Sequence, residues 1–413
     1  MKGMNFKKCI EYGLENSPHL KKSGLEIDIR HLDESDSRWS FVPFIYLRSS
    51  YALNKYRSQR DDDLRDWSIS FTTGSYDPLK TYFTLKAQEQ LTRIAILVHL
   101  QTINEGIYKM AEGFINLEYL EKAASFQKKV EELAREDFDF VEKRHKLGSA
   151  SLLQVQIAAQ RLAVIQNQSE KLEITKASIL DEFRGFLGVK EGKTINIDST
   201  DASRQVLAEF DPETVSLEQA KDSSFMVSIH KIREKLQDWR ITLAYAEYIP
   251  KVSFTVKTPD VAQSDLEGTE FYGAVNAQVP VWEGFKRSRD ITRQEKILKQ
   301  FQSETEIKEG DLSSDWRSTQ RKLRNAKISL KLAKSSEKLA GLKVQGTEIG
   351  YKSNQKTYSD LLESRIENIK AQAETMEKTR DLDLALLSIR HLSGDLFGSH
   401  VKVEPWEEEL LDE

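Results

Sequence analysis

The sequence predicts a mainly α-helical protein with a small β portion, arranged as two structural repeats of long helical hairpins and short strands. Glycine and proline are scarce, at 19 and 8 of 413 residues, while charged residues make up 31% of the chain. Such usage is typical of long exposed helices rather than compact α/β domains. Period-two alternation marks four short segments as strands. Features of the first half recur about 206 positions later, which indicates a duplicated unit.

The duplication rests on three pairs of features at a nearly constant spacing. One chance match would be weak, but three at spacings of 206 or 207 positions point to a repeated unit. We therefore expect one repeat over residues 1–207 and another over residues 208–413. The matched pairs are Pro43 with Pro250, Gly148 with Asn354, and residues 76–79 with residues 282–285.

Each repeat is expected to begin with a helix that leads into two strands. In the third strand, for example, Val252, Phe254 and Val256 alternate with polar residues, which places the two sets on opposite faces. A soluble β-sandwich would give the same pattern. The expected strands cover about 44–56, 66–74, 251–257 and 269–281.

The context of the strands favours a membrane. Their length of about 10 residues suits a tilted transmembrane strand. The connecting segments 57–65 and 258–268 are polar and acidic, as exposed hairpin loops should be. Four strands cannot close a membrane barrel, so several chains would have to share one. Aromatic residues gather near the strand ends at Trp39, Phe41, Phe44, Tyr46, Tyr76, Tyr248 and Trp282.

Two long helices follow each strand pair, at about 79–147 and 151–187 in the first repeat and about 285–350 and 356–396 in the second. A helix of about 70 residues is about 100 Å long, so it has to bundle with its hairpin partner and with other copies. Heptad spacing predicts coiled-coil packing. The seam positions are Leu323, Ala326, Leu330, Ala333, Ala340 and Val344; Leu362, Ile366, Ile369, Ala373 and Met376; Ile103, Ile107, Met110, Phe114 and Leu117; and Val155, Ala158, Leu162 and Ile165.

Several classes of protein are disfavoured. No apolar run is long enough for a transmembrane helix, and a net charge of −5 gives no reason to expect nucleic-acid binding. A single cysteine, Cys9, rules out an intrachain disulfide and a cysteine-cluster metal site. The seven histidines show no metal-binding spacing, and no nucleotide-binding or catalytic motif is present. We expect neither an enzyme nor a cofactor, and a disordered acidic tail after His400.

Several short motifs, in order, resemble the TolC family of outer-membrane channel proteins over nearly the whole chain. Residues 9–18 resemble the family's ALxxNPxL helix start, and residues 144–148 resemble its RxxxG turn. Residues 350–362 resemble GYxxGxRTxxDVL. The corners at 76–77 and 281–284 resemble the LFDGG-like junction of strand and long helix.

The resemblance implies a homotrimer with a 12-stranded barrel in the outer-membrane lipid and a helical tunnel across the periplasm. A smaller mixed region is expected around 188–217. Such channels receive substrate from an inner-membrane pump through a periplasmic adaptor protein, in tripartite efflux or type I secretion, and perform no chemistry. No secretory signal is visible, so an exported chain would have had its signal removed. The alternative is a soluble coiled-coil scaffold that binds partner helices.

The resemblance also implies site residues at the two helical-hairpin turns. Tyr351, Asp360, Glu363 and Lys356 match positions at the periplasmic entrance. Asp360 and Glu363, three residues apart, share one helix face and would form stacked acidic rings in a trimer. Solvated surface carboxylates remain the alternative. Lys356 stands where the family has arginine, and a lysine cannot form the two parallel hydrogen bonds that a guanidinium makes to a carboxylate. Asn354 stands where the family has glycine, and asparagine tolerates a left-handed backbone. Adaptor-contacting residues are expected at Arg144, Leu147, Gly148, Ser149, Gly350, Ser353 and Asn354.

Overall fold

The structure is a computed structural model of the full chain. The residues that it describes are 3–42, 45–51, 67–73, 78–190, 196–208, 210–248, 251–257, 272–278 and 282–399. The predicted hairpin loops, the acidic tail, and the aromatic residues Phe44 and Tyr76 lie outside these ranges.

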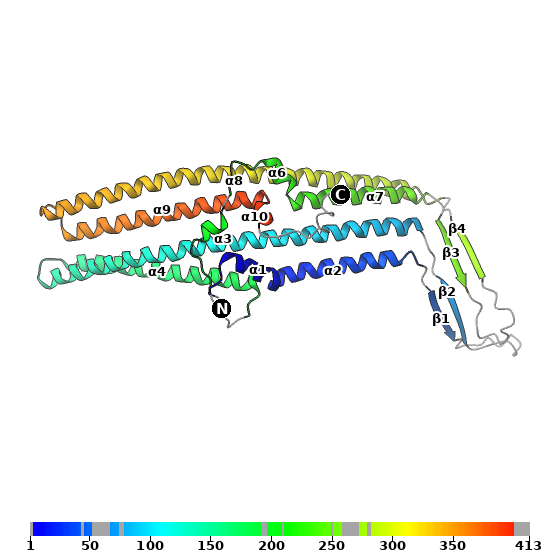
Figure 1. The fold of residues 1–413 in the computed structure, drawn as a ribbon, viewed down its shortest axis with the longest axis horizontal. Helices are drawn as coiled ribbons and strands as arrows, with labels where there is room; N and C mark the ends of the chain where they lie inside the picture. Colours follow the sequence, from blue (N-terminus) through cyan, green and yellow to red (C-terminus); the bar gives the residue numbers. More distant parts are fainter. Residues whose placement is uncertain are drawn as a thin grey trace. The chain divides into compact units, whose positions relative to one another are not determined.

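The chain is mainly helical, as predicted, and two helices stand out by length (Figure 1). They contain 69 and 67 residues. The helices are α1 (Phe6–Asn16), α2 (Pro18–Trp39), α3 (Pro78–Lys146), α4 (Leu152–Leu187), α5 (Ala202–Val206), α6 (Leu217–Asp222), α7 (Phe225–Ala246), α8 (Lys286–Lys352), α9 (Tyr358–Leu392) and α10 (Asp395–Gly398).

The four strands are β1 (Ile45–Tyr51), β2 (Trp67–Thr73), β3 (Lys251–Lys257) and β4 (Tyr272–Gln278). They form one antiparallel sheet in the order β1-β2-β3-β4. The two hairpins pair along their whole length, whereas β2 and β3 meet at Thr72 and Lys257. The strands β1 and β4 are therefore the edges of the sheet that the structure describes.

The chain forms two compact units, each drawn from both halves of the sequence. Unit 1 contains Met1–Lys22, Leu100–Phe225 and Glu309–Glu413, and unit 2 contains Ser23–His99 and Met226–Lys308. Each unit takes residues from both predicted repeats, and the long helices α3 and α8 each contribute residues to both units.

In unit 2, polar contacts join each shorter helix to the start of a long one. Thr92 of α3 donates its hydroxyl proton to the Glu34 carboxylate of α2 over 3.2 Å. In the second such pair of helices, the Gln237 amide of α7 donates to the side chain of Gln294 in α8 over 2.8 Å. Gln237 is 1% exposed, so leaving its amide NH2 group unpaired would be costly.

In unit 1, the heptad seams pack the helices together. Val130 and Ala134 of α3 meet Ile165 of α4 and Ile366 of α9 in one buried cluster. A second cluster joins α8, through Trp316, Leu323 and Ala326, to Ala385 and Ile389 of α9 and Ala220 of α6. The seam positions Ile107, Phe114 and Leu117 are also buried. Buried side chains of this size each contribute about 1.5–3 kcal/mol.

The start and end of α4 illustrate how the sequence sets the helix bounds. Ser151 and Gln154 form a reciprocal capping box at its start. Gly188 ends the helix in the left-handed region, at φ 64°. A side chain at this position would come within 2.7 Å of the Asn16 carbonyl oxygen, so only glycine fits. No described helix is both long enough and apolar enough to cross a membrane.

Candidate functional site at the hairpin turns

The first turn, between α3 and α4, is held by its own residues. Gly148 adopts a left-handed backbone at φ 75°. The Arg144 guanidinium donates to the Ser149 carbonyl over 3.0 Å, and the Ser149 hydroxyl donates to the Arg144 carbonyl over 3.0 Å. Leu147 projects from the turn and is 83% exposed. The turn thus presents an apolar side chain on a locally fixed backbone.

The second turn, between α8 and α9, closes around one carbonyl. The Gly350 carbonyl oxygen accepts hydrogen bonds from the backbone N–H groups of Gln355, at 2.8 Å, and Lys356, at 3.1 Å. The Ser353 hydroxyl donates to the same oxygen over 3.1 Å. Asn354 is left-handed, with φ 59°, as its residue type allows. The left-handed residues of the two turns, Gly148 and Asn354, are the pair that the sequence repeat matched.

Tyr358, the first residue of α9, ties the second turn to the first hairpin. Its ring lies 5.0 Å from Phe140 of α3 and 5.7 Å from Tyr351. Its hydroxyl donates a short hydrogen bond to the Glu136 carboxylate of α3. That bond raises the pKa of the Tyr358 phenol. Tyr351, the predicted entrance tyrosine, thus stacks next to a residue that the sequence did not single out.

A buried carboxylate next to this tyrosine makes further contacts between the two hairpins. Asp137 of α3 is 5% exposed and accepts a 3.0 Å hydrogen bond from the Ser359 hydroxyl. The Arg161 guanidinium of α4 lies 3.6 Å from Asp137 and 3.8 Å from Glu363 of α9. One arginine therefore bridges a buried carboxylate and one of the two predicted entrance acids.

The other entrance acid, Asp360, closes the start of α9. One of its carboxylate oxygens accepts hydrogen bonds from the Thr357 backbone N–H and hydroxyl, each at 2.8 Å. These bonds, helped by the charge of Lys356, lower the pKa of Asp360. The carboxylate stays ionised at neutral pH. Its capping role does not depend on the role predicted at an entrance.

Tyr358, Glu136, Asp137 and Arg161 are not among the site residues predicted from the sequence. Glu136 and Tyr358 are 222 residues apart, so no local pattern links them. The cap could have been read from Thr357 and Asp360, because a threonine three residues before an acid at a helix start is a capping signal.

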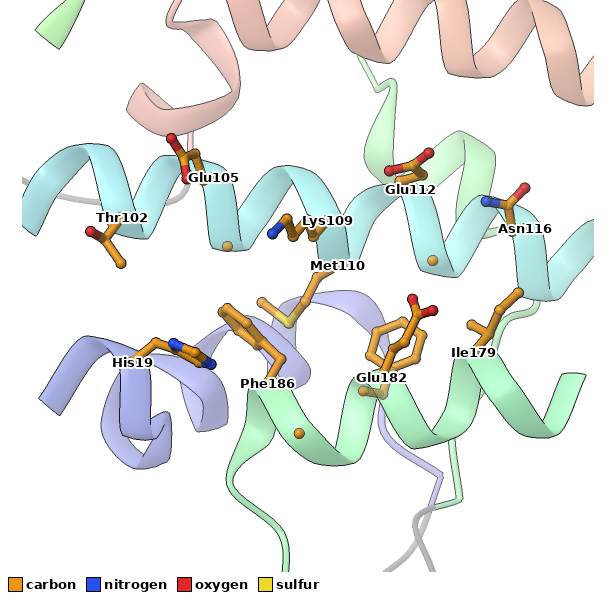
Figure 2. A pocket seen from close by; sticks show the side chains of 14 residues that line it. His19, Thr102, Glu105, Lys109, Met110, Glu112, Asn116, Ile179, Glu182 and Phe186 are labelled. Carbon is orange, nitrogen blue, oxygen red and sulfur yellow. The ribbon is translucent and has the colours of Figure 1, made fainter. Parts of the chain in front are cut away.

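A hollow in unit 1 is separate from the turns. It holds about 730 Å³ beside α3 and α4, and His19 of α2 borders it (Figure 2). Gly106 and Gly113 of α3 make room for the rings of Phe186 and Phe183; an added Cβ would approach those rings to 2.5 and 2.8 Å. None of the predicted site residues lines this hollow. Among the described residues, no three histidine, cysteine or acidic side chains form a group that could hold a metal.

Comparisons with known proteins identify the fold. No family model and no curated protein matches the sequence. The structure is similar to the outer membrane channel CmeC of Campylobacter jejuni, with a TM-score of 0.79 at 13% identity over 98% of this chain and 88% of that one. A membrane protein from Pseudomonas aeruginosa gives 0.79 at 12% identity over 94% and 92%. The open state of the MtrE outer membrane channel of Neisseria gonorrhoeae gives 0.72 at 13% identity over 94% and 88%.

Proposed function

The chain has the fold of the outer-membrane channels of the TolC family, in agreement with its sequence motifs, and on this premise we propose that it is an outer-membrane exit duct. In this proposal the duct receives substrates from an inner-membrane transporter and a periplasmic adaptor, in a tripartite efflux pump or a type I secretion system. The observation that carries the proposal is the likeness to solved channels over 94–98% of the chain. The duct is a conduit without enzymatic activity or cofactor.

The unpaired edges of the sheet favour a barrel that several copies of the chain form together. In the part of the sheet that the structure describes, β1 and β4 are edges, and unpaired backbone groups at a sheet edge cost several kcal/mol each in lipid. Three copies placed edge to edge would close a 12-stranded barrel. In this proposal the two repeats of each chain supply two strands each.

The turns are the proposed periplasmic end. Leu147 is the most exposed large apolar side chain of the described chain and suits contact with an adaptor. The turn backbones on either side of Gly148 and Asn354 are rigid because hydrogen bonds close them locally. The proposed adaptor-contacting set is Arg144, Leu147, Gly148, Ser149, Gly350, Ser353 and Asn354.

The proposed constriction is formed by Tyr351, Lys356, Asp360 and Glu363. Asp360 supplies fixed negative charge, because its hydrogen bonds to Thr357 lower its pKa. The Glu363 side chain is 57% exposed, and its 3.8 Å pair with Arg161 is solvated, so that pair is worth at most about 1 kcal/mol. Glu363 is therefore free to turn toward a cation held on a threefold axis.

Fractionation tests the duct against a soluble coiled-coil scaffold. The full chain, expressed behind an export signal, should be found in the outer-membrane fraction and need detergent for extraction. Its protein mass in detergent should be about three times the 47.5 kDa of one chain. A protein that stays in solution without detergent at the mass of one or two chains would favour the scaffold.

A further inference from the structure

The start of α8 carries an excess of positive charge. Between Trp282 and Gln300 the sequence holds six basic and three acidic residues, hence a net charge of +3 in a chain whose net charge is −5. The first turn of the helix contains no acidic residue. The basic residues are Lys286, Arg287, Arg289, Arg293, Lys296 and Lys299.

Helix stability does not explain these charges. The start of a helix carries a partial positive charge, so basic residues there are unfavourable. Elsewhere on the surface a basic side chain can be paired with an acid one turn away, as Lys146 is with Glu142 over 3.0 Å. Among the described residues, Lys286, Arg289 and Lys296 have no such acidic partner. They are therefore available to a negatively charged partner from outside the chain.

Four of the basic side chains share one exposed face of the helix, which we call the cationic face. They are spaced by three, four and three residues, which keeps them within about a third of the helix circumference. On the opposite side Ile291 is buried, and Gln294 is bound to Gln237 of α7. The cationic face consists of Lys286, Arg289, Arg293 and Lys296, all of them exposed.

A hollow on the cationic face has the chemistry of an anion site. It holds about 490 Å³, and Arg289, Arg293 and Lys296 line it together with Ser288. Arg293 also forms an ion pair with Asp290, which leaves the other two cations to set the charge of the hollow. A guanidinium binds a phosphate group through two parallel hydrogen bonds, and a lysine binds it as a point charge. The hollow therefore suits a phosphate group.

The cationic face begins next to the sheet. The strand β4 ends at Gln278 and α8 starts at Lys286, and both belong to unit 2. Figure 1 shows the start of α8 beside the sheet. The four cations span about 15 Å of helix. That length covers a lipid headgroup layer of about 5–8 Å and the 8–10 Å beyond it over which charges interact at physiological salt.

Two exposed aromatic rings precede the cationic face in the sequence. Trp282 and Phe285 are 74% and 69% exposed, and their ring centroids are 5.2 Å apart. Phe285 keeps this exposed position with a left-handed backbone, at φ 58°, which is costly for an aromatic residue. Exposed aromatic rings next to lysine and arginine are typical of a protein surface at a membrane interface.

We propose that the cationic face of α8 binds the headgroups of anionic phospholipids, and that Trp282 and Phe285 enter the same leaflet, which is the one on the side of the helices. The ligand is a phosphodiester with a net negative charge, such as phosphatidylglycerol. A zwitterionic lipid such as phosphatidylcholine has no net charge and is not favoured in this way. This inference rests on the proposed function, which puts the strands in the membrane.

Native mass spectrometry of the detergent-purified full chain tests the lipid preference. Mixed micelles supply phosphatidylglycerol and phosphatidylcholine in equal amounts. The wild-type protein should retain at least about tenfold more phosphatidylglycerol, since each nearby cation favours an anionic lipid about fivefold. Arg289→Gln, Arg293→Gln and Lys296→Gln combined should lower this preference to about twofold. The preference of the wild-type protein should also fall as salt is raised.

The matched control changes three exposed lysines of α8 that lie in unit 1. Lys327→Gln, Lys331→Gln and Lys334→Gln combined remove the same charge from the same helix, about 45 Å further along it. This variant should keep the preference of the wild-type protein. An equal loss of preference in both variants would show that net charge alone attracts the lipid, and would overturn the inference.

Tryptophan fluorescence gives a second readout that changes no charge. Phosphatidylglycerol with bromine atoms near the headgroup end of its acyl chains quenches tryptophans at the interface. Trp282→Phe should lower the fraction of the fluorescence that is quenched. Trp316→Phe should raise it, because Trp316 is 4% exposed and contributes fluorescence that the lipid does not reach. A quenched fraction that does not fall in Trp282→Phe would contradict the position of this ring in the lipid.

The outcomes separate this inference from the proposed function. A trimer that retains both lipids equally would overturn the lipid site and keep the duct. If the variant with three changes at the cationic face separates into single chains, this face packs against a neighbouring copy, which would also overturn the lipid site. A wild-type chain that stays in solution without detergent would contradict the proposed function itself.

Discussion

The two ends of the helical part of unit 1 are held in different ways. At the turns, two contacts between the hairpins are exposed or half-exposed, Arg161 with Glu363 and the hydroxyl of Tyr358 with Glu136, and Asp137, which contacts Ser359 and Arg161, is buried. At the other end, charged groups are buried. Arg390 of α9 is 6% exposed, and Glu118 of α3 is 8% exposed.

The buried end is organised around that arginine. Its guanidinium donates to Asp395 over 2.7 Å, to the Ser399 hydroxyl over 2.8 Å and to the Val206 carbonyl, and it lies 5.7 Å from the ring of Phe210. It thereby joins α9, α5 and α10. A buried charge with all its partners is costly to disturb, whereas an exposed pair is not. The difference indicates that the exposed contacts between the hairpins near the turns can be broken at small cost, while the contacts of Arg390 hold the hairpins together at the other end.

The largest expected effect comes from removing the buried arginine. Arg390→Met leaves the Val206 carbonyl without its partner and should lower the free energy of unfolding by about 2–4 kcal/mol. The control is Arg365→Met, which removes an exposed pair with Glu348 on the same helix and should cost less than about 1 kcal/mol. Urea titration in detergent measures both. Equal losses of unfolding free energy from the two variants would contradict the proposed difference between the two ends.

A pH effect is expected from Asp383, also at the buried end. Burial raises its pKa to about 6, and the charge of Glu118 adds to this, against a hydrogen bond from Ser203. The folded state therefore holds a proton that the unfolded state has lost, and stability should fall as pH rises from about 4 to 6. Asp383→Asn should remove this slope and stabilise the protein at pH 7 by about 1–2 kcal/mol after allowance for solvent screening. An unchanged pH profile in the variant would contradict the assignment.

At the turns, the two left-handed residues should respond in opposite directions. Gly148→Ala forces a Cβ into φ 75°, where no neighbour lies within 4 Å, so the cost of about 1 kcal/mol is purely that of the backbone. Asn354→Gly relieves the same conformation and should be neutral or stabilising by a few tenths of a kcal/mol. Thermal unfolding followed by circular dichroism distinguishes the two. An increase in stability from Gly148→Ala would show that residue 148 does not adopt the left-handed backbone conformation.

A loss of stability about as large as that from Gly148→Ala is expected from removing the hydrogen bond between the hairpins. Tyr358→Phe keeps the ring on Phe140 but loses the hydroxyl bond to Glu136, and should cost about 0.5–1.5 kcal/mol. Tyr351→Phe is the matched control, because its hydroxyl makes no hydrogen bond within the described residues. Hydrogen exchange at the start of α9 should rise in the first variant alone. Equal exchange in both would mean that the Glu136 bond does not hold the turn.

Local sequence signals predicted much of the fold. Heptad spacing identified Leu323, Ala326 and Ala333, which are buried, and the left-handed tolerance of asparagine identified Asn354. The contacts made by Arg390 and Tyr358 could not be predicted, because their partners lie up to 222 residues away and depend on how the hairpins pack. The boundary between the two units has no local sequence signal, because it falls within α3 and α8, whose sequence pattern is unbroken there.

The role of Asp360 and Glu363 as entrance acids is a prediction that conductance measurements can test. In a planar bilayer, divalent cations should block the wild-type channel. Asp360→Ala combined with Glu363→Ala should remove the block, since it removes both acidic rings. Thr357→Ala is the control, because it disturbs the same helix start and leaves both carboxylates in place. If divalent cations still block the double variant, the chain forms a channel but the two acids do not form the cation site at its entrance.

Single-channel recording of the detergent-purified wild-type protein decides whether this chain forms a channel. We expect discrete, cation-selective conductance steps from a trimer. The absence of steps from a protein that remains in solution without detergent would contradict this expectation.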